Sequence, residues 1–272
     1  RPNFHHALRH WVQGTLRHFQ AYPTFHRTFR DFPSDIIGFL AIHLGRSDRL
    51  HWRNLQAQGA RTGLISAGRA GALLLRMQDI GFIAPAEAFR AGRSRRYRPT
   101  PAMLNSFAER AMVDLRSAAL IDPAIAAAVE DMAQDEDSTF ALLDAFAEAM
   151  LEESSIRSLG ERPPLNGTPF MAMGKQIALS IAADAMGRRG DVWDGPVEIA
   201  LSSYAHRFDV SRAHVRRALQ TLEPCGLTRF EDDPHRLLIT LRFCEAIEAY
   251  YAIVFDRAMR MVDRLRAPTQ LG

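Results

Sequence analysis

Arginines crowd one short stretch of the sequence, and their spacing suits recognition of nucleic acid. Ser211, Arg212, His214, Arg216 and Arg217 follow one another at the start of a predicted helix. A planar guanidinium donates paired hydrogen bonds to a phosphate or to the edge of a guanine base. A serine at a helix start accepts hydrogen bonds from the first free amides, and a phosphate is favoured there. We therefore expect the arginines and the histidine to enter a DNA groove, with the serine positioning the helix.

A second group of arginines lies in a predicted β-hairpin, residues 82–98, whose two strands flank an Ala-Gly turn. Their positive charge suits contacts with the phosphate backbone. The candidates are Arg93, Arg95, Arg96 and Arg98. A later predicted hairpin, residues 227–241, carries Asp232 and Asp233 at its tip, and phosphates would repel these carboxylates. We therefore assign base reading to the helix at 211–225 and backbone binding to the first hairpin.

The stretch around Ser211 has an earlier copy in the same chain. Residues 65–83 and 210–228 align without a gap at a constant offset, with Ser66 on Ser211. Each copy places apolar residues three and four positions apart and ends at a glycine, which is typical of an amphipathic helix and its C-terminal stop. A duplicated supersecondary unit indicates a repeated fold.

The outer face of the first copy is poorer in hydrogen-bond donors than that of the second. Ser66 and Arg69 are its DNA-binding candidates, but Gly71 stands where Arg216 stands in the second copy. We therefore expect the first copy to make fewer base contacts and the DNA target to be asymmetric.

Residues 210–227 resemble the recognition segment of GntR-type and MarR-type winged-helix transcription regulators. The positions that fit the family pattern are Val210, Ser211, Val215, Arg216, Leu219, Leu222, Gly226 and Leu227. The first copy fits through Ile65, Ser66, Leu74, Met77, Gly81 and Phe82. The long flanking helices are more similar to MarR architecture, in which such helices form the dimer interface. The resemblance implies a transcription regulator of double-stranded DNA, more often a repressor than an activator.

The expected fold is mainly α with small β-hairpin wings. It is a tandem winged helix-turn-helix duplication, arranged as a single-chain counterpart of a two-fold dimer. Apolar spacing and capping residues predict helices at 6–19, 34–44, 55–62, 66–80, 101–119, 137–155, 171–186, 202–208, 211–225 and 243–265, and a strand at 197–201. Ser34 is the expected N-cap of the second helix and Gly45 its stop. We expect a first winged-helix unit with flanking helices at residues 1–121, an acidic helix and linker at 122–169, and a second winged-helix unit with a C-terminal helix at 170–272.

Composition is that of a globular protein, with 47% hydrophobic and 24% charged residues and a net charge of +3. No apolar run reaches the length of a membrane span, and the first residues lack the apolar core of a signal peptide. Cys225 and Cys244 form no disulfide framework or metal-type spacing, which favours a reduced, cytoplasmic protein at the nucleoid. Residues 122–153 contain acids but no Lys or Arg, which indicates a face turned away from DNA.

The sequence contains none of the common catalytic or nucleotide-binding motifs, so we expect no enzyme and no cofactor. His5, His6 and His10 lack a carboxylate or thiol to complete a metal site, and we expect none. The sequence leaves undecided whether the protein binds a small-molecule effector, for which Trp11, Trp52 and Trp193 are candidate pocket residues. It also leaves undecided whether the protein forms a homodimer. The alternative function is a winged-helix platform for protein interaction or chromosome organisation, or a replication initiator.

Overall fold

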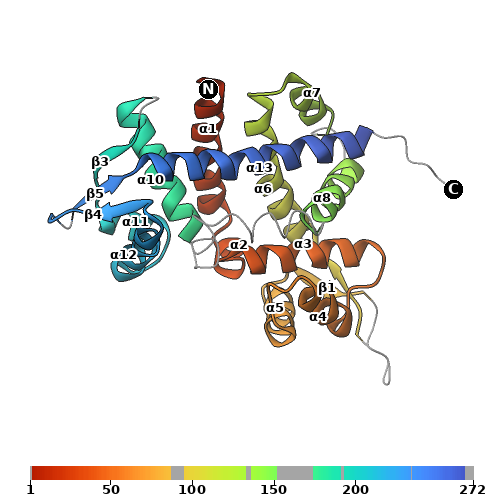
Figure 1. The fold of residues 1–272 in the computed structure, drawn as a ribbon. Coiled ribbons are helices and arrows are strands. Elements are labelled where there is room, and N and C mark those ends of the chain that lie inside the picture. The colour runs from red at the N-terminus through yellow and green to blue at the C-terminus, as the bar shows by residue number, and fades with distance from the viewer. Residues whose placement is uncertain are drawn as a thin grey trace.

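The computed structural model describes residues 2–86, 95–132, 136–151, 174–190, 193–233 and 235–266. These residues form a mostly helical protein with two small antiparallel sheets (Figure 1). The expected class, mainly α with small β elements, is confirmed.

The elements follow one another in an order that repeats in outline. The helices are α1 (Pro2–Ala21), α2 (Pro23–Thr28), α3 (Phe32–Arg46), α4 (Trp52–Arg61), α5 (Ala67–Asp79), α6 (Pro101–Ala119), α7 (Pro123–Met132), α8 (Glu136–Leu151), α10 (Gly174–Arg189), α11 (Leu201–Arg207), α12 (Arg212–Gln220) and α13 (Leu241–Arg266). A 3-10 helix, η2 (Glu223–Cys225), follows α12. The strands are β1 (Ile83–Pro85), β2 (Tyr97–Pro99), β3 (Gly195–Glu198), β4 (Thr228–Phe230) and β5 (Arg236–Ile239).

The centre of the molecule is formed by α1, α6, α8 and α13. Helix α1 packs against α6 and also against α10, whereas α8 packs against α13 and also against α3. Helix α13 runs across the middle of the molecule in Figure 1 and contacts α6. Aromatic side chains fill this centre: the ring of Trp11 meets that of Tyr251 edge-on at 5.2 Å, and Phe4 lies 5.7 Å from Phe255.

Two smaller groups of elements attach to this centre. The first module consists of α3, α4, α5, β1 and β2, and the second of α10, β3, α11, α12, β4 and β5. Figure 1 shows α4 and α5 below α3, and α11 and α12 at the other end of the molecule, below the three-stranded sheet. In the first module α3 packs on α4 and α5, and in the second α10 packs on α12.

The sheets of the two modules share one strand arrangement. In the second module β3, which precedes α11, pairs with β5, and β5 pairs with β4. In the first module β1 pairs with β2, with Ile83 opposite Pro99 and Pro85 opposite Tyr97. The segment before α4 adds a single bridge on the other side of β2, between His51 and Arg96. The strand that precedes the helix pair therefore lies beside the last strand in both modules.

Helices α5 and α12 begin in the same way. Ser66 precedes α5 and its hydroxyl accepts a hydrogen bond from the backbone N–H of Arg69, at 3.3 Å. Ser211 precedes α12 and its hydroxyl accepts one from the backbone N–H of His214, at 3.0 Å. Both serines were expected as N-caps, and the structure confirms them.

The chain also leaves the two helices in the same way. Gly81 and Gly226 have φ angles of +75° and +68°, in the left-handed region that favours glycine. The hydroxyl of Thr100 donates to the carbonyl of Gly81, and the hydroxyl of Thr240 donates to that of Gly226, both at 2.8 Å. Each threonine thus ties the start of the next long helix to the turn after α5 or α12.

Several expected boundaries are wrong. Ser34 is not the N-cap of α3: Asp31 is the cap, and Ser34 completes a capping box by accepting from the N–H of Asp31. Gly45 does not stop α3, which ends at Arg46. The helix expected at 211–225 ends at Gln220, because Pro224 lacks the N–H that would donate to the carbonyl of Gln220.

Two short helices, α2 and α7, were not expected. Helix α8 lies within the span expected as acidic helix and linker, and it packs between α3 and α13. Leu142, Leu143 and Ala147 are buried there. The rest of the span expected as linker, residues 152–169, lies outside the described residues.

Candidate nucleic-acid interface

Helix α12 is held in place by one apolar side. Val215, Ala218 and Leu219 are buried, and they are spaced three and four residues apart. This buried stripe fixes the rotation of the helix, so the intervening residues face outward. Its N-terminal end carries the partial positive charge of the helix dipole, and the amides there favour a phosphate.

The polar side of α12 presents cations to solvent. Arg212 and Arg217 are exposed, and Arg216 and His214 are half-buried. The guanidinium of Arg216 lies over the ring of Phe230 on β4, 4.9 Å from its centroid. Such stacking limits the freedom of the side chain while its N–H groups stay available at the rim of the ring. The sequence-based candidates on α12 therefore share one surface, and one of them is already oriented.

The hairpin beside α12 carries charge of both signs. Glu231 pairs with Arg236 at 3.1 Å, and Asp232 and Asp233 are exposed at the turn. Glu223 accepts a hydrogen bond from the N–H of Phe230 at 2.9 Å, which fixes the strand that supports Arg216. The positive surface is thus concentrated on the helix side of this module.

Helix α5 offers a different surface at the equivalent place. Arg69 is half-exposed, but its guanidinium pairs with the carboxylate of Asp31 at 2.5 Å. A side chain at Gly71 would meet the indole of Trp52, since a Cβ there would lie 2.5 Å from Cζ2 of that ring. Trp52 therefore fills the place that the arginine side chain takes in the second module, which explains the glycine in physical terms.

The described arginines of the first hairpin have different neighbours. Arg98 pairs with Asp48 at 3.0 Å, and Arg95 lies 5.8 Å from the ring centroid of Tyr97. Arg96 is exposed next to the bridge with His51. Arg93 lies outside the described residues. The described arginines lie on or next to β2, whereas the candidates of the second module lie on α12, at the opposite side of the view in Figure 1.

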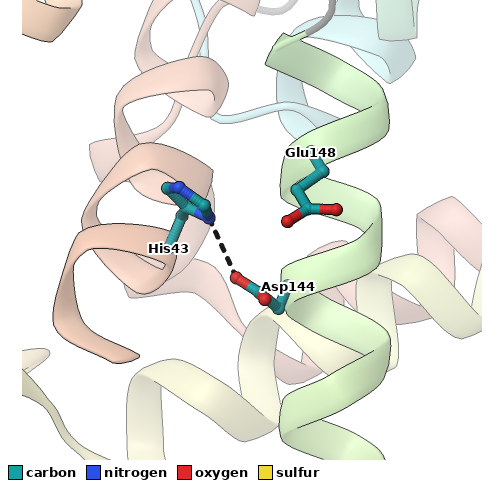
Figure 2. A group of neighbouring side chains, drawn as sticks. All are labelled: His43, Asp144 and Glu148. Atoms are coloured by element: carbon teal, nitrogen blue, oxygen red, sulfur yellow. Dashed lines mark hydrogen bonds and ion pairs between the residues drawn. The ribbon is translucent and has the colours of Figure 1, made fainter. Parts of the chain in front are cut away.

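Sequence reasoning missed a cluster of ligand-type side chains between α3 and α8. His43, Asp144 and Glu148 bring their nitrogen and carboxylate atoms within 4.8 Å of one another, and Figure 2 shows them facing the same gap. Nδ1 of His43 lies 2.9 Å from Oδ1 of Asp144, and Arg46 contacts the other oxygen of that carboxylate. Asp144 and Glu148 have the i, i+4 spacing of one helix face, but nothing local links them to His43.

His43 and Asp144 stabilise each other's charged forms. The hydrogen bond to Asp144 raises the pKa of His43, against partial burial of the ring. Burial pushes the pKa of Asp144 upward, but the hydrogen bonds from His43 and Arg46 outweigh burial and lower it. The imidazole is therefore biased toward its protonated form and the carboxylate toward its ionised form.

A cavity of about 40 Å³ opens between α1, α3, α6, α8 and α13. Its polar lining includes Asp35, Arg110 and Asp114, and the last two form an ion pair at 2.7 Å. The volume accommodates a few water molecules. Of the tryptophans expected to line a pocket, Trp11 borders this cavity, whereas Trp52 and Trp193 lie elsewhere.

Comparison with known protein families, with curated proteins and with solved structures gives no match. None of the helices in the described part of the chain combines the length and apolar character that crossing a membrane requires.

Proposed function

We propose that this chain is a tandem winged-helix protein that binds double-stranded DNA in a sequence-specific way and regulates transcription as a repressor at the nucleoid. Helix α12 reads bases through Arg212, His214, Arg216 and Arg217, and the first hairpin contacts the phosphate backbone. The observation that carries the proposal is the polar side of α12, where exposed cations flank a serine-capped N-terminus.

Internal repetition supports the tandem part of the proposal. The two modules share a capped second helix, a left-handed glycine after it and a strand order in which the first strand lies beside the last. The reciprocal packing of α1 on α10 and of α8 on α3 supports a pseudo-two-fold relation between the halves. A single chain would then offer two candidate recognition helices, as a dimer of single modules does.

The difference between the modules supports an asymmetric role. The Arg69 guanidinium is held by Asp31, and the place equivalent to Arg216 is filled by Trp52. Phosphate contacts from the first module would come from Arg95, Arg96 and Arg98 instead. The target site would therefore carry one strongly specified half.

The test begins with selection of bound sequences from random duplex DNA, followed by fluorescence anisotropy on the enriched site. We expect one enriched motif and an affinity that falls steeply with salt, because each phosphate contact contributes about one unit to the logarithmic salt slope. The Arg212→Ala/Arg217→Ala variant should lose more than about tenfold in affinity, at about 1–3 kcal/mol for each base-reading contact.

The matched control is Arg260→Ala, which removes a half-exposed arginine in the C-terminal part of α13, outside both hairpins. It should bind as the unmodified protein does. Absence of any enriched sequence, or equal affinity of the double variant and the control, would refute the role of α12.

A second candidate function rests on the first module. Leu75 on α5 is 54% exposed and Trp52 on α4 is 37% exposed, an apolar surface where a recognition helix would carry polar groups. This surface favours docking of a protein partner on the first module. Mutation of Leu75→Gln that leaves DNA affinity unchanged but abolishes a stable complex would support this function.

A further inference from the structure

We propose that His43, Asp144 and Glu148 form a binding site for a divalent transition-metal ion of the zinc class, bridging α3 and α8. This proposal does not depend on DNA binding. It rests on three ligand-type side chains, from two helices far apart in the sequence, that gather at one partly open place (Figure 2).

The donor set selects the class of ion. One imidazole nitrogen and two carboxylate oxygens suit zinc and its neighbours, whereas calcium and magnesium prefer oxygen ligands alone. Zinc takes nitrogen and oxygen at about 2.0–2.2 Å, which places two tetrahedral ligands about 3.3 Å apart. The 2.9 Å between His43 Nδ1 and Asp144 Oδ1 needs only a small opening to admit the ion.

Burial differs across the site in a way that suits metal binding. The side chain of Asp144 is only 11% exposed and is held by packing of α8 on α3, whereas that of His43 is 35% exposed. Glu148 is exposed at the outer side. An ion can therefore enter from solvent, and a water molecule can supply the fourth ligand.

Two cations compete with the metal. The first is the proton on His43, which would be released to solvent when the imidazole nitrogen becomes a ligand. The second is the guanidinium of Arg46, whose side chain is half-exposed and can turn outward from Asp144. Arg49 adds a further positive charge near the imidazole. Zinc must therefore displace both cations from the carboxylate and the imidazole.

The test uses zinc chloride and the full chain, with isothermal titration calorimetry and thermal unfolding. We expect one saturable zinc site and a higher Tm in zinc. Cobalt(II) at the same site should give the visible absorption bands of a low-coordinate ion, and calcium should give no response.

Three variants decide the location. His43→Ala and Glu148→Gln should each weaken zinc binding by more than about tenfold, and Glu148→Gln replaces an exposed carboxylate by an amide of the same size, so the fold should persist. Arg46→Gln should instead strengthen zinc binding, because it removes a competing cation. General damage to the α3–α8 contact would weaken binding in all three.

The control is His6→Gln/His10→Gln, which removes the histidines at one-turn spacing in α1 and should leave zinc affinity unchanged. Zinc affinity that falls in this control but not in Glu148→Gln would place the ion in α1 and overturn the proposal. Failure to detect saturable binding of zinc or cobalt at neutral pH would overturn it as well.

Discussion

Acid should destabilise this protein through one buried imidazole. His18 on α1 is almost fully buried, and its Nε2 lies 2.9 Å from the carbonyl oxygen of Ser106 on α6. The carbonyl can only accept, so Nε2 carries the proton, and Nδ1 accepts from Nε2 of His26 at 2.8 Å. Burial, with a smaller contribution from the charge of Arg110, lowers the pKa of His18 to about 4.

The magnitude follows from the two pKa values. In the unfolded chain the pKa of a histidine is about 6.5, so between pH 6.5 and pH 4 the unfolded state binds the proton and the folded state does not. Stability is therefore fully present above pH 6.5 and falls as pH drops, by about 2 kcal/mol at pH 5 and about 3 kcal/mol at pH 4 and below. A loss of 2 kcal/mol corresponds to a decrease in Tm of roughly 5 °C.

The assay is urea unfolding at pH 7.5 and pH 5, followed by circular dichroism. The glutamine in His18→Gln keeps an N–H that can reach Ser106, but it cannot be protonated. The change in unfolding free energy between the two pH values should therefore be smaller in this variant than in the unmodified protein, by about 2 kcal/mol. The control His6→Gln removes an exposed histidine and should keep the full pH dependence. Equal pH dependence in all three proteins would refute the assignment to His18.

Two further perturbations test the structure of the modules. Ser211→Ala should cost about 1 kcal/mol in unfolding free energy through loss of the cap of α12, measured by urea unfolding. Ser211→Val also lacks the acceptor oxygen, so a simple cap predicts the same loss in both variants, and a smaller loss in Ser211→Ala would contradict it. Gly71→Ala should cost about 1–3 kcal/mol because the added methyl meets the Trp52 indole, and the cost should shrink in a Trp52→Leu background. An unchanged cost in that background would show that the indole is not the obstacle.

Local signals in the sequence were sufficient for much of the fold. Helix α6 was expected at 101–119 and is observed at those residues, because Pro101 fits the first turn after the threonine cap. The serine caps and the glycine after α5 were likewise readable, since they depend only on neighbouring residues. The short helix α2 escaped detection because six residues carry too little periodicity to distinguish it from a loop.

The features of the site that were missed all depend on long-range packing. The pairing of Arg69 with Asp31 joins the start of α5 to the start of α3, and no spacing along the chain indicates it. His43 and Asp144 meet only because α8 packs on α3. A sequence pattern identifies which residues can donate charge, whereas the tertiary fold decides which of those charges are already neutralised.

The packing of α1 on α10 and of α8 on α3 determines how fragments of the protein should behave. Helix α1 of the first half packs on α10 of the second, and α8 of the second half packs on α3 of the first. Neither half alone therefore buries the apolar side of α1 or of α8. Separate expression of residues 1–121 or 122–272 would leave a long apolar strip exposed on each piece. Two such pieces produced together should instead reassemble by fragment complementation, each supplying the cover that the other lacks.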